Sequence, residues 1–250
     1  NLIGLVSVTA SVGYGVTGFI NSLLGLYSPS YATNFMGGDF IKQQFVLFLI
    51  VLAFATVVNI YSSKLLAAFN NISVWWHVFG AALIIGILLF TTDKHQSLNW
   101  MFTTQNNNSG FGDNTYWYLV LPLGFLLTQY TITGFDASAH VSEETGQAGK
   151  AAAQGLWKAV AYSAVAGWIL LLAFLYAATN VEMMNEWFGF SPIIFLTSLP
   201  IFWAKLIMVV TLVGQFFCGM SCVTAASRMC FAFSRDEAVP GHKFWRKLDK

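Results

Sequence analysis

Six apolar segments, separated by polar stretches, make up most of the chain. Each is long enough, or nearly so, to cross the roughly 30 Å hydrocarbon core of a bilayer as an α-helix. We therefore predict an all-α, polytopic membrane protein with one transmembrane domain, residues 1–250, and about six transmembrane helices. The predicted spans are residues 2–26, 41–61, 72–91, 116–133, 154–179 and 201–233.

The connections between these spans are polar, with two details that the structure can test. Residues 62–71 are expected to form a loop between the second and third spans. The sequence SPIIFLTSL, residues 191–199, is expected to form a short helix at the membrane interface. In the first span, small residues recur every three or four positions, which places them on one face where another helix can approach closely. Close packing and ligand contact both remain open as uses of that face.

The fourth apolar segment is followed by residues that do not suit an uninterrupted membrane helix. These are Gly134, Phe135, Asp136, Ala137, Ser138 and His140. A carboxylate at bilayer depth is costly and usually faces an internal cavity or an ion path. Glycine also allows the backbone to leave helical geometry. The stretch therefore predicts a broken helix whose freed amides and carbonyls line a site, as in many secondary transporters. The alternative is a helix that ends at Gly134, with Asp136 capping a cytoplasmic one.

The composition excludes a soluble domain. Hydrophobic residues make up 56% of the chain and charged residues 9%, whereas soluble domains contain about 25% charged residues. Cys218, Cys222 and Cys230 show neither a disulfide nor a metal-binding pattern. We expect no cofactor, no metal and no nucleic-acid partner, and the net charge of +1 gives no indication of an anionic partner. The chain begins inside an apolar segment without methionine, so we expect a fragment of a longer protein.

The basic residues predict the orientation in the membrane. Nine of the twelve Lys and Arg residues fall in 62–71, 140–158 and 228–250, which alternate spans place on one side. The positive-inside rule assigns that side to the cytoplasm. Residues 140–158 and 228–250 are therefore expected to be cytoplasmic in a cell-membrane protein, and the fourth span runs from outside to inside.

His77 follows two tryptophans in the third span and is a candidate for ion coupling. Histidine titrates near physiological pH, so a buried His77 would suit proton transfer. Tryptophans also gather at membrane interfaces, where His77 would be only an interfacial hydrogen-bonding group.

Charged residues near the predicted cytoplasmic face suggest a gate. Glu143 and Glu144 follow the broken segment, and Arg228 and Arg235 lie near the end of the last span. Pairing of Glu143 or Glu144 with Arg235 or Arg228 would close a cytoplasmic mouth, although exposed pairs contribute at most about 1 kcal/mol. The arginines have the alternative role of positive-inside anchors. His140 and Glu144 have metal-ligand spacing, but no second cluster completes a catalytic site.

Four stretches resemble one transporter family. GFDASAHVSEET (134–145) and GLWKAVAYSAVAGW (155–168) resemble the sixth and seventh helices of amino-acid permeases of the amino acid–polyamine–organocation superfamily, in the branch with amino-acid/choline and GABA-type permeases. ASRMCFAFSRDEAVP (226–240) resembles the end of the eighth helix, and the chain's first fifteen residues are similar to the third. One departure is Glu237, where the family commonly has glycine after Arg-Asp.

The resemblance implies a leucine-transporter-type fold of inverted repeats, of which this chain would hold helices three to eight. It implies that Gly134, Phe135, Asp136, Ala137 and Ser138 contact the substrate, with the aromatic ring closing over it. His77 resembles the site of an ionisable helix-five residue in some proton-coupled relatives. The implied function is secondary active transport of amino acids or related amines by alternating access, proton-coupled or by exchange. The alternatives to a transporter are a channel or receptor and a membrane-embedded enzyme. The helix-one half of the substrate site lies outside this sequence.

Overall fold

The structure is a computed structural model, and every regular element in its described part is a helix. The described residues are 2–61, 63–103, 107, 109–140, 142, 146–186 and 191–247. Five described helices are long and apolar enough to cross a membrane. These are α1 (Leu2–Tyr27), α3 (Phe40–Tyr61), α4 (Ser63–Phe90), α9 (Ala148–Ala177) and α12 (Ile201–Arg235). The all-helical, polytopic prediction is confirmed, and the fourth predicted span, 116–133, is the one divided into shorter pieces.

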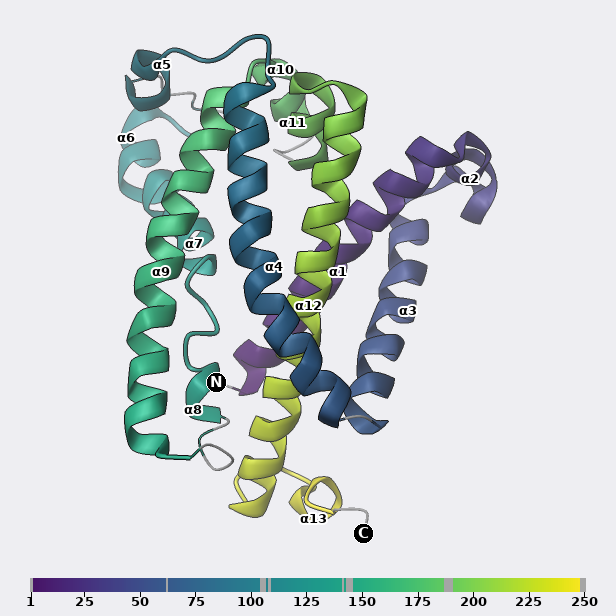
Figure 1. Cartoon of the computed structure of the whole chain (residues 1–250), viewed down its shortest axis with the longest axis vertical. Helices are drawn as coiled ribbons and strands as arrows, with labels where there is room; N and C mark the ends of the chain where they lie inside the picture. Colours follow the sequence, from purple (N-terminus) through teal and green to yellow (C-terminus); the bar gives the residue numbers. More distant parts are fainter. Residues whose placement is uncertain are drawn as a thin grey trace. The chain divides into compact units, whose positions relative to one another are not determined.

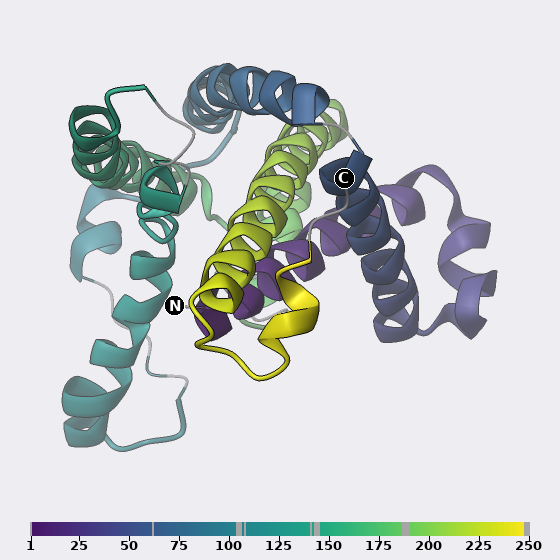
Figure 2. The same cartoon turned by 90° about the horizontal axis from the view of Figure 1, so that it is seen from below.

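The chain divides into two compact units, residues 1–83 with 200–250 and residues 84–199. In the first unit, α1 packs against α12 and crosses it obliquely (Figures 1 and 2). Small residues of α1 permit this approach, because a Cβ at Gly15 would lie 3.1 Å from Gln215 Oε1 of α12. A Cβ at Gly13 would lie 3.0 Å from the Phe48 ring of α3. These glycines serve close packing, one of the two uses expected for small residues in the first span.

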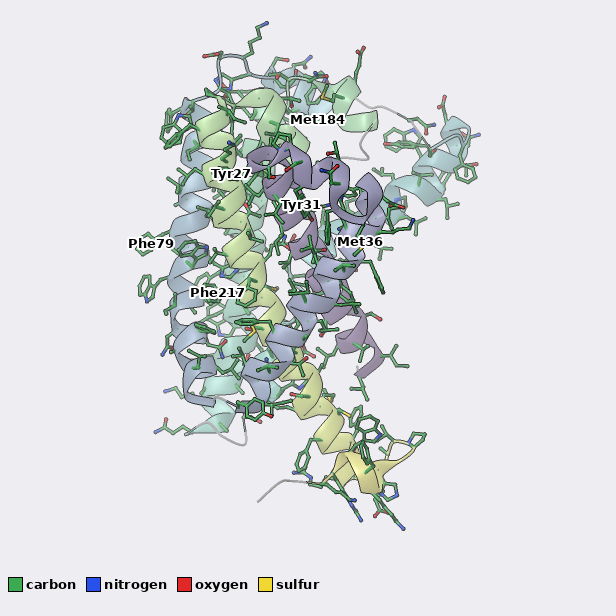
Figure 3. All side chains as sticks on the ribbon, turned by 90° about the vertical axis from the view of Figure 1, so that its right-hand side faces the viewer. Tyr27, Tyr31, Met36, Phe79, Met184 and Phe217 are labelled. Atoms are coloured by element: carbon green, nitrogen blue, oxygen red, sulfur yellow. The ribbon has the colours of Figure 1, made fainter. Side chains whose placement is uncertain are left out.

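Helices α3 and α4 join α12 through an apolar cluster of Ala55, Val58, Leu66 and Met220, with Phe69, Phe216 and Val223 packed against it. The Phe69 and Phe217 rings also meet, with centroids 5.7 Å apart. Phe79, on the other face of α4, points away from α12 (Figure 3). The predicted loop at 62–71 is wrong, because α4 begins at Ser63 and the chain is helical from there.

The connection from α1 to α3 is itself folded. It contains α2 (Pro29–Asn34) and η1 (Phe35–Gly38), where Tyr31 and Met36 lie beyond the end of α1 (Figure 3). Two buried glutamines at the start of α3 hold it in place by donating to main-chain carbonyls. Gln43 Nε2 donates to Phe35 O over 2.8 Å, and Gln44 Nε2 donates to Tyr14 O over 3.1 Å. A buried side-chain amide without such partners would be costly, so these bonds fix the connection against α1 and α3.

The second unit is built along α9. Its other elements are α5 (Leu98–Thr103), α6 (Asp113–Thr115), the π-helical turn η2 (Tyr116–Val120), α7 (Leu121–Tyr130), α8 (Ala137–His140), α10 (Val181–Glu186) and α11 (Ser191–Ser198). Phe195 of α11 is buried against Phe174 of α9, with ring centroids 5.5 Å apart. The short helix expected in SPIIFLTSL is confirmed as α11, while its position at an interface stays a prediction.

Candidate transport site

The predicted break in the fourth apolar segment is present. Helix α7 ends at Tyr130, residues 131–136 form turns, and α8 begins at Ala137. The amides of residues 131–133 donate to carbonyls three residues earlier, over 3.1–3.3 Å, so the helix tightens before it ends. Gly134 has φ of +81°, a left-handed conformation that L side chains rarely adopt. The interruption covers 131–136, whereas the prediction placed it at 134–138, so Ala137 and Ser138 belong to the second helical piece.

Asp136 lies between the two pieces and faces His140. Its Oδ2 atom is 3.3 Å from His140 Nε2, although the two atoms do not satisfy hydrogen-bond geometry. The His140 side chain is 12% exposed and that of Asp136 is 33% exposed. Among the described residues, no backbone amide of α8 donates to the Asp136 carboxylate. The carboxylate therefore faces an ionisable side chain and remains accessible, which a helix cap alone would not require.

Two glycines of α9 support the broken segment. A Cβ at Gly155 would lie 2.8 Å from Ser138 Oγ and 2.9 Å from Ser138 Cβ. A Cβ at Gly167 would lie 2.6 Å from Thr131 Cγ2. Real Cβ atoms essentially never make such contacts, so both positions require glycine for this packing. Thr131 at the start of the break and Ser138 in the helical piece that follows it are thus packed on α9.

A groove of about 510 Å³ lies between the end of α7 and α9. This volume is within the range of small-molecule sites. It is lined by Thr128, Gln129, Thr131, Ile132, Ala164, Gly167, Trp168, Leu170, Leu171 and Phe174. None of the predicted substrate residues lines this groove, which begins on the N-terminal side of the break. Phe135, expected to close over substrate, is 45% exposed.

His77 of α4 faces α12 within the first unit, but its side chain is exposed, so the buried position expected for proton transfer is not found. Its Nδ1 atom is 2.7 Å from the Ser73 carbonyl oxygen, which can only accept. Nδ1 therefore carries the proton in the neutral ring, and Nε2 is the nitrogen that can take up another. Nε2 would lie 3.5 Å from a Cβ at Gly214 of α12.

The neighbouring tryptophans differ in their surroundings. Trp76 Nε1 donates to Val210 O of α12 over 2.9 Å, so Trp76 joins two helices within the first unit. Trp75 is exposed and stacks on Phe79, with ring centroids 5.7 Å apart. A position at the membrane interface therefore explains Trp75 better than Trp76.

Polar side chains near Ser221 of α12 join this helix to α3 and α4. Thr224 Oγ1 donates to Asn59 Oδ1 over 2.6 Å, and Ser221 Oγ donates to Asn70 Oδ1 over 3.2 Å. Such contacts hold membrane helices in register, because an unpaired polar group in hydrocarbon is costly. Polar residues at the helical spacing of three on α12 were the available sequence signal.

The described residues include only part of the predicted gate. Glu143 and Glu144 lie outside the described residues. Arg235 ends α12, and its Nε atom is 3.3 Å from Asp236 Oδ1. The pairing across the mouth therefore stays a prediction.

Comparison with known proteins identifies the family. The profile described as amino acid permease matches residues 1–250. The chain belongs to the amino acid permease family. The amino-acid permease BAT1 of Arabidopsis thaliana is 31% identical over 262 residues, covering 100% of this chain and 50% of that protein. The GABA-specific permease of Saccharomyces cerevisiae is 29% identical over 196 residues, covering 75% of this chain and 34% of that protein.

A third relative is the polyamine transporter TPO5 of S. cerevisiae, which is 26% identical over 209 residues, or 82% of this chain and 33% of that protein. The chain thus spans half or less of the length of these relatives. No solved structure matches it significantly. The resemblance found in the sequence is confirmed, and family membership implies the leucine-transporter-type fold.

Membership also decides between the function classes considered from the sequence. Permeases are transporters, so the enzyme alternative is set aside.

In this permease chain the broken segment packs on α9, and the two glycines that allow this packing were not predicted from the sequence. Their signal was faint, because Gly155 and Gly167 stand in a long apolar helix where glycine disfavours helix formation by about 1 kcal/mol relative to alanine. At these two positions the glycine permits close approach by the broken segment.

Proposed function

We propose that the protein containing this chain is a secondary active transporter of amino acids or related amines that works by alternating access. The observation that carries the proposal is the helix break at 131–136. None of the hydrogen bonds between described residues uses the amides of Phe135 or Asp136. Free amides before a short helix suit a substrate carboxylate, and the Asp136 carboxylate suits an ammonium group.

In this proposal, Gly134, Phe135, Asp136, Ala137 and Ser138 supply one half of the substrate site. A zwitterion presents a carboxylate and an ammonium group, which match the two kinds of groups at the break. The names of the relatives, which include GABA and polyamines, support amines as the broader substrate class. Phe135, whose ring is 45% exposed, would close over the substrate.

We further propose proton coupling at His77, with exchange as the alternative mode. The Ser73 carbonyl fixes the tautomer, so that Nε2 takes up and releases the proton beside Gly214. Transport would then require His77 to change its protonation as the permease alternates. Residues 140–158 and 228–250 would be cytoplasmic in a cell-membrane protein, and Glu143 or Glu144 would pair with Arg235 in the inward-closed state.

The deciding experiment is uptake into proteoliposomes made with the full-length protein. Radiolabelled amino acids, GABA and a polyamine are offered in turn, with an imposed proton gradient and with the gradient collapsed by an ionophore. The proposal predicts saturable, gradient-dependent accumulation of at least one of these compounds. Ion conductance without saturable uptake would favour a channel instead, and absence of accumulation across the panel would overturn the proposal.

A further inference from the structure

The segment that follows α12 carries a compact group of cations and aromatic rings. Helix α12 ends at Arg235, and α13 (His242–Trp245) lies beside that end of α12 (Figures 1 and 2). Phe244 and Trp245 are 67% and 54% exposed, which is unusual for large rings in water. Aromatic residues of this kind are typical of the boundary between a membrane and water.

The chain reaches this position through a tight helix end. The Ala238 amide donates to Phe233 O over 2.8 Å and the Glu237 amide donates to Ser234 O over 3.3 Å, which together form a Schellman motif. Glu237 occupies its left-handed position with φ of +59°, where glycine is the usual residue. A glutamate therefore stands at the one position of this turn that favours glycine.

The contacts of the Glu237 side chain give a reason for a glutamate at this position. Its Oε1 atom is 3.2 Å from Arg246 Nη1 and 3.9 Å from His242 Nδ1. The Arg246 contact is a hydrogen-bonded ion pair and ties the C-terminal end of α13 to the turn that closes α12, whereas His242 lies beyond hydrogen-bond distance. The turn and the ion pair thus hold α13 close to the end of a membrane span instead of leaving it to extend into water.

Two lysines of the same segment remain available for another partner. Lys243 and Lys247 are four residues apart, and the amide of Lys247 donates to Phe244 O over 3.3 Å, so the helical turn continues to that point. Helical spacing of four places both ammonium groups on one face. Within the described residues, no carboxylate lies within ion-pair distance of either lysine.

We propose that residues 242–247 form an interfacial site for anionic phospholipid headgroups. Lys243 and Lys247 contact the headgroup phosphates and carboxylates, and Phe244 and Trp245 enter the boundary region beside them. A cation close to an anionic membrane surface strengthens binding by about fivefold, so two lysines give about 25-fold. The proposal needs only that α12 spans the membrane and is independent of the transported substrate.

The test is hydrogen–deuterium exchange of the full-length protein in lipid nanodiscs. One set contains phosphatidylcholine alone and the other contains phosphatidylcholine with about one third phosphatidylserine. The amides of residues 242–247 are expected to exchange about tenfold more slowly in the anionic discs, and high salt is expected to remove the difference because it screens the headgroups.

The double variant Lys243→Gln with Lys247→Gln should lose this protection. The matched control, Lys150→Gln with Lys158→Gln, removes two cations elsewhere on the same predicted side and should keep it. Equal exchange in the two kinds of disc would overturn the proposal. Equal loss of protection in the control would also overturn it, since general charge would then explain the effect. Because exchange is measured without transport, failure here is distinguishable from failure of the proposed function.

Discussion

Ser138 lies directly against Gly155, so closely that a Cβ on the glycine would stand 2.8 Å from the serine Oγ. Thr131 bears the same relationship to Gly167, at 2.6 Å. The break in the fourth apolar segment is thus positioned from both sides by one long helix, α9. Any movement of α9 during transport would carry these two contacts with it.

Replacing either glycine by alanine should displace the broken segment. Overpacking of this kind typically costs about 1–3 kcal/mol, so we expect Gly155→Ala and Gly167→Ala to lower the thermal stability of the detergent-solubilised protein and to reduce uptake. Gly149→Ala is the matched control in α9, because a Cβ there meets nothing within 4 Å. The gain in helix propensity should leave that variant as stable as the wild type or slightly more so.

Compensating changes separate this steric effect from a general loss of folding. Thr131→Ser removes the methyl group that Gly167→Ala would meet, and Ser138→Gly removes both close atoms at Gly155. Each should restore stability to its own alanine variant and not to the other one. If neither pair shows such specific rescue in a double-mutant cycle, α9 does not seat the break in the way described.

Gly134→Ala tests the backbone rather than the space around it. A Cβ at Gly134 meets nothing within 4 Å, but φ of +81° is unfavourable for alanine. The left-handed conformation costs about 1–2 kcal/mol for an L residue, so uptake and stability should both fall. Gly124→Ala in α7 also has open space and no positive φ, and it should be neutral or stabilising. Equal effects of the two substitutions would contradict a requirement for this conformation.

The sequence predicted the membrane class, the long helices and the break because these depend on local patterns. Segment hydrophobicity locates α1, α3 and α12 within two residues at each end, whereas α9 begins at Ala148, six residues before its predicted start. The loop predicted at 62–71 was wrong because Leu-Leu-Ala-Ala at residues 65–68 continues the helix despite the polar residues that follow. Polarity of single residues does not end a helix when the backbone remains favourable.

The residues that position the candidate site were harder to predict because they depend on contacts between distant parts of the chain. Gly155 is 17 residues from Ser138 and Gly167 is 36 residues from Thr131 along the sequence. The Asp136–His140 contact, by contrast, follows from helical spacing of four, but the prediction considered His140 together with Glu144 instead. Contacts between separate segments require packing information that periodicity does not contain.

The hydrogen bond from Thr224 to Asn59 should contribute to the packing of α12 on α3. Thr224→Val removes the donor while keeping the shape, and interhelical bonds in membranes average about 0.6 kcal/mol with larger values up to about 1.7. We expect a measurable fall in thermal stability in detergent, with Thr224→Ser close to wild type. Thr56→Val on α3 is the control, because among the described residues the Thr56 hydroxyl bonds within its own helix, to Leu52 O. A loss as large in the control would indicate an effect on the helix itself.

Asp39 gives the permease a pH-dependent element outside its membrane spans. The backbone amide of Lys42 lowers the pKa of the Asp39 carboxyl most, followed by the Lys42 side chain. A lowered folded-state pKa means that the stabilisation is present above the ordinary pKa of 3.8 and is lost as the pH falls through the folded value. Asp39→Asn should therefore be less stable than wild type at neutral pH.

The difference between Asp39→Asn and wild type should disappear in acid, where the wild-type carboxyl is also neutral. Asparagine can still cap α3, so this variant isolates the charge. Asp39→Ala removes the cap as well and should be less stable than Asp39→Asn throughout the pH series. Thermal unfolding measured from pH 7 to pH 3 checks both expectations, and a gap that widens in acid would show that the sign is wrong.

The most consequential prediction concerns His77. If Nε2 of this side chain carries the coupled proton, His77→Ala should remove the dependence of uptake on an imposed proton gradient. Exchange of preloaded substrate, which needs no net proton movement, should persist in the same vesicles and shows that the variant is folded. His95→Gln is the matched control, because His95 lies in a connecting segment, stacked on Tyr176 with ring centroids 4.2 Å apart. If uptake by His77→Ala still depends fully on the proton gradient, His77 does not carry the coupled proton. If both variants lose the gradient dependence equally, the effect belongs to histidine titration in general and not to His77.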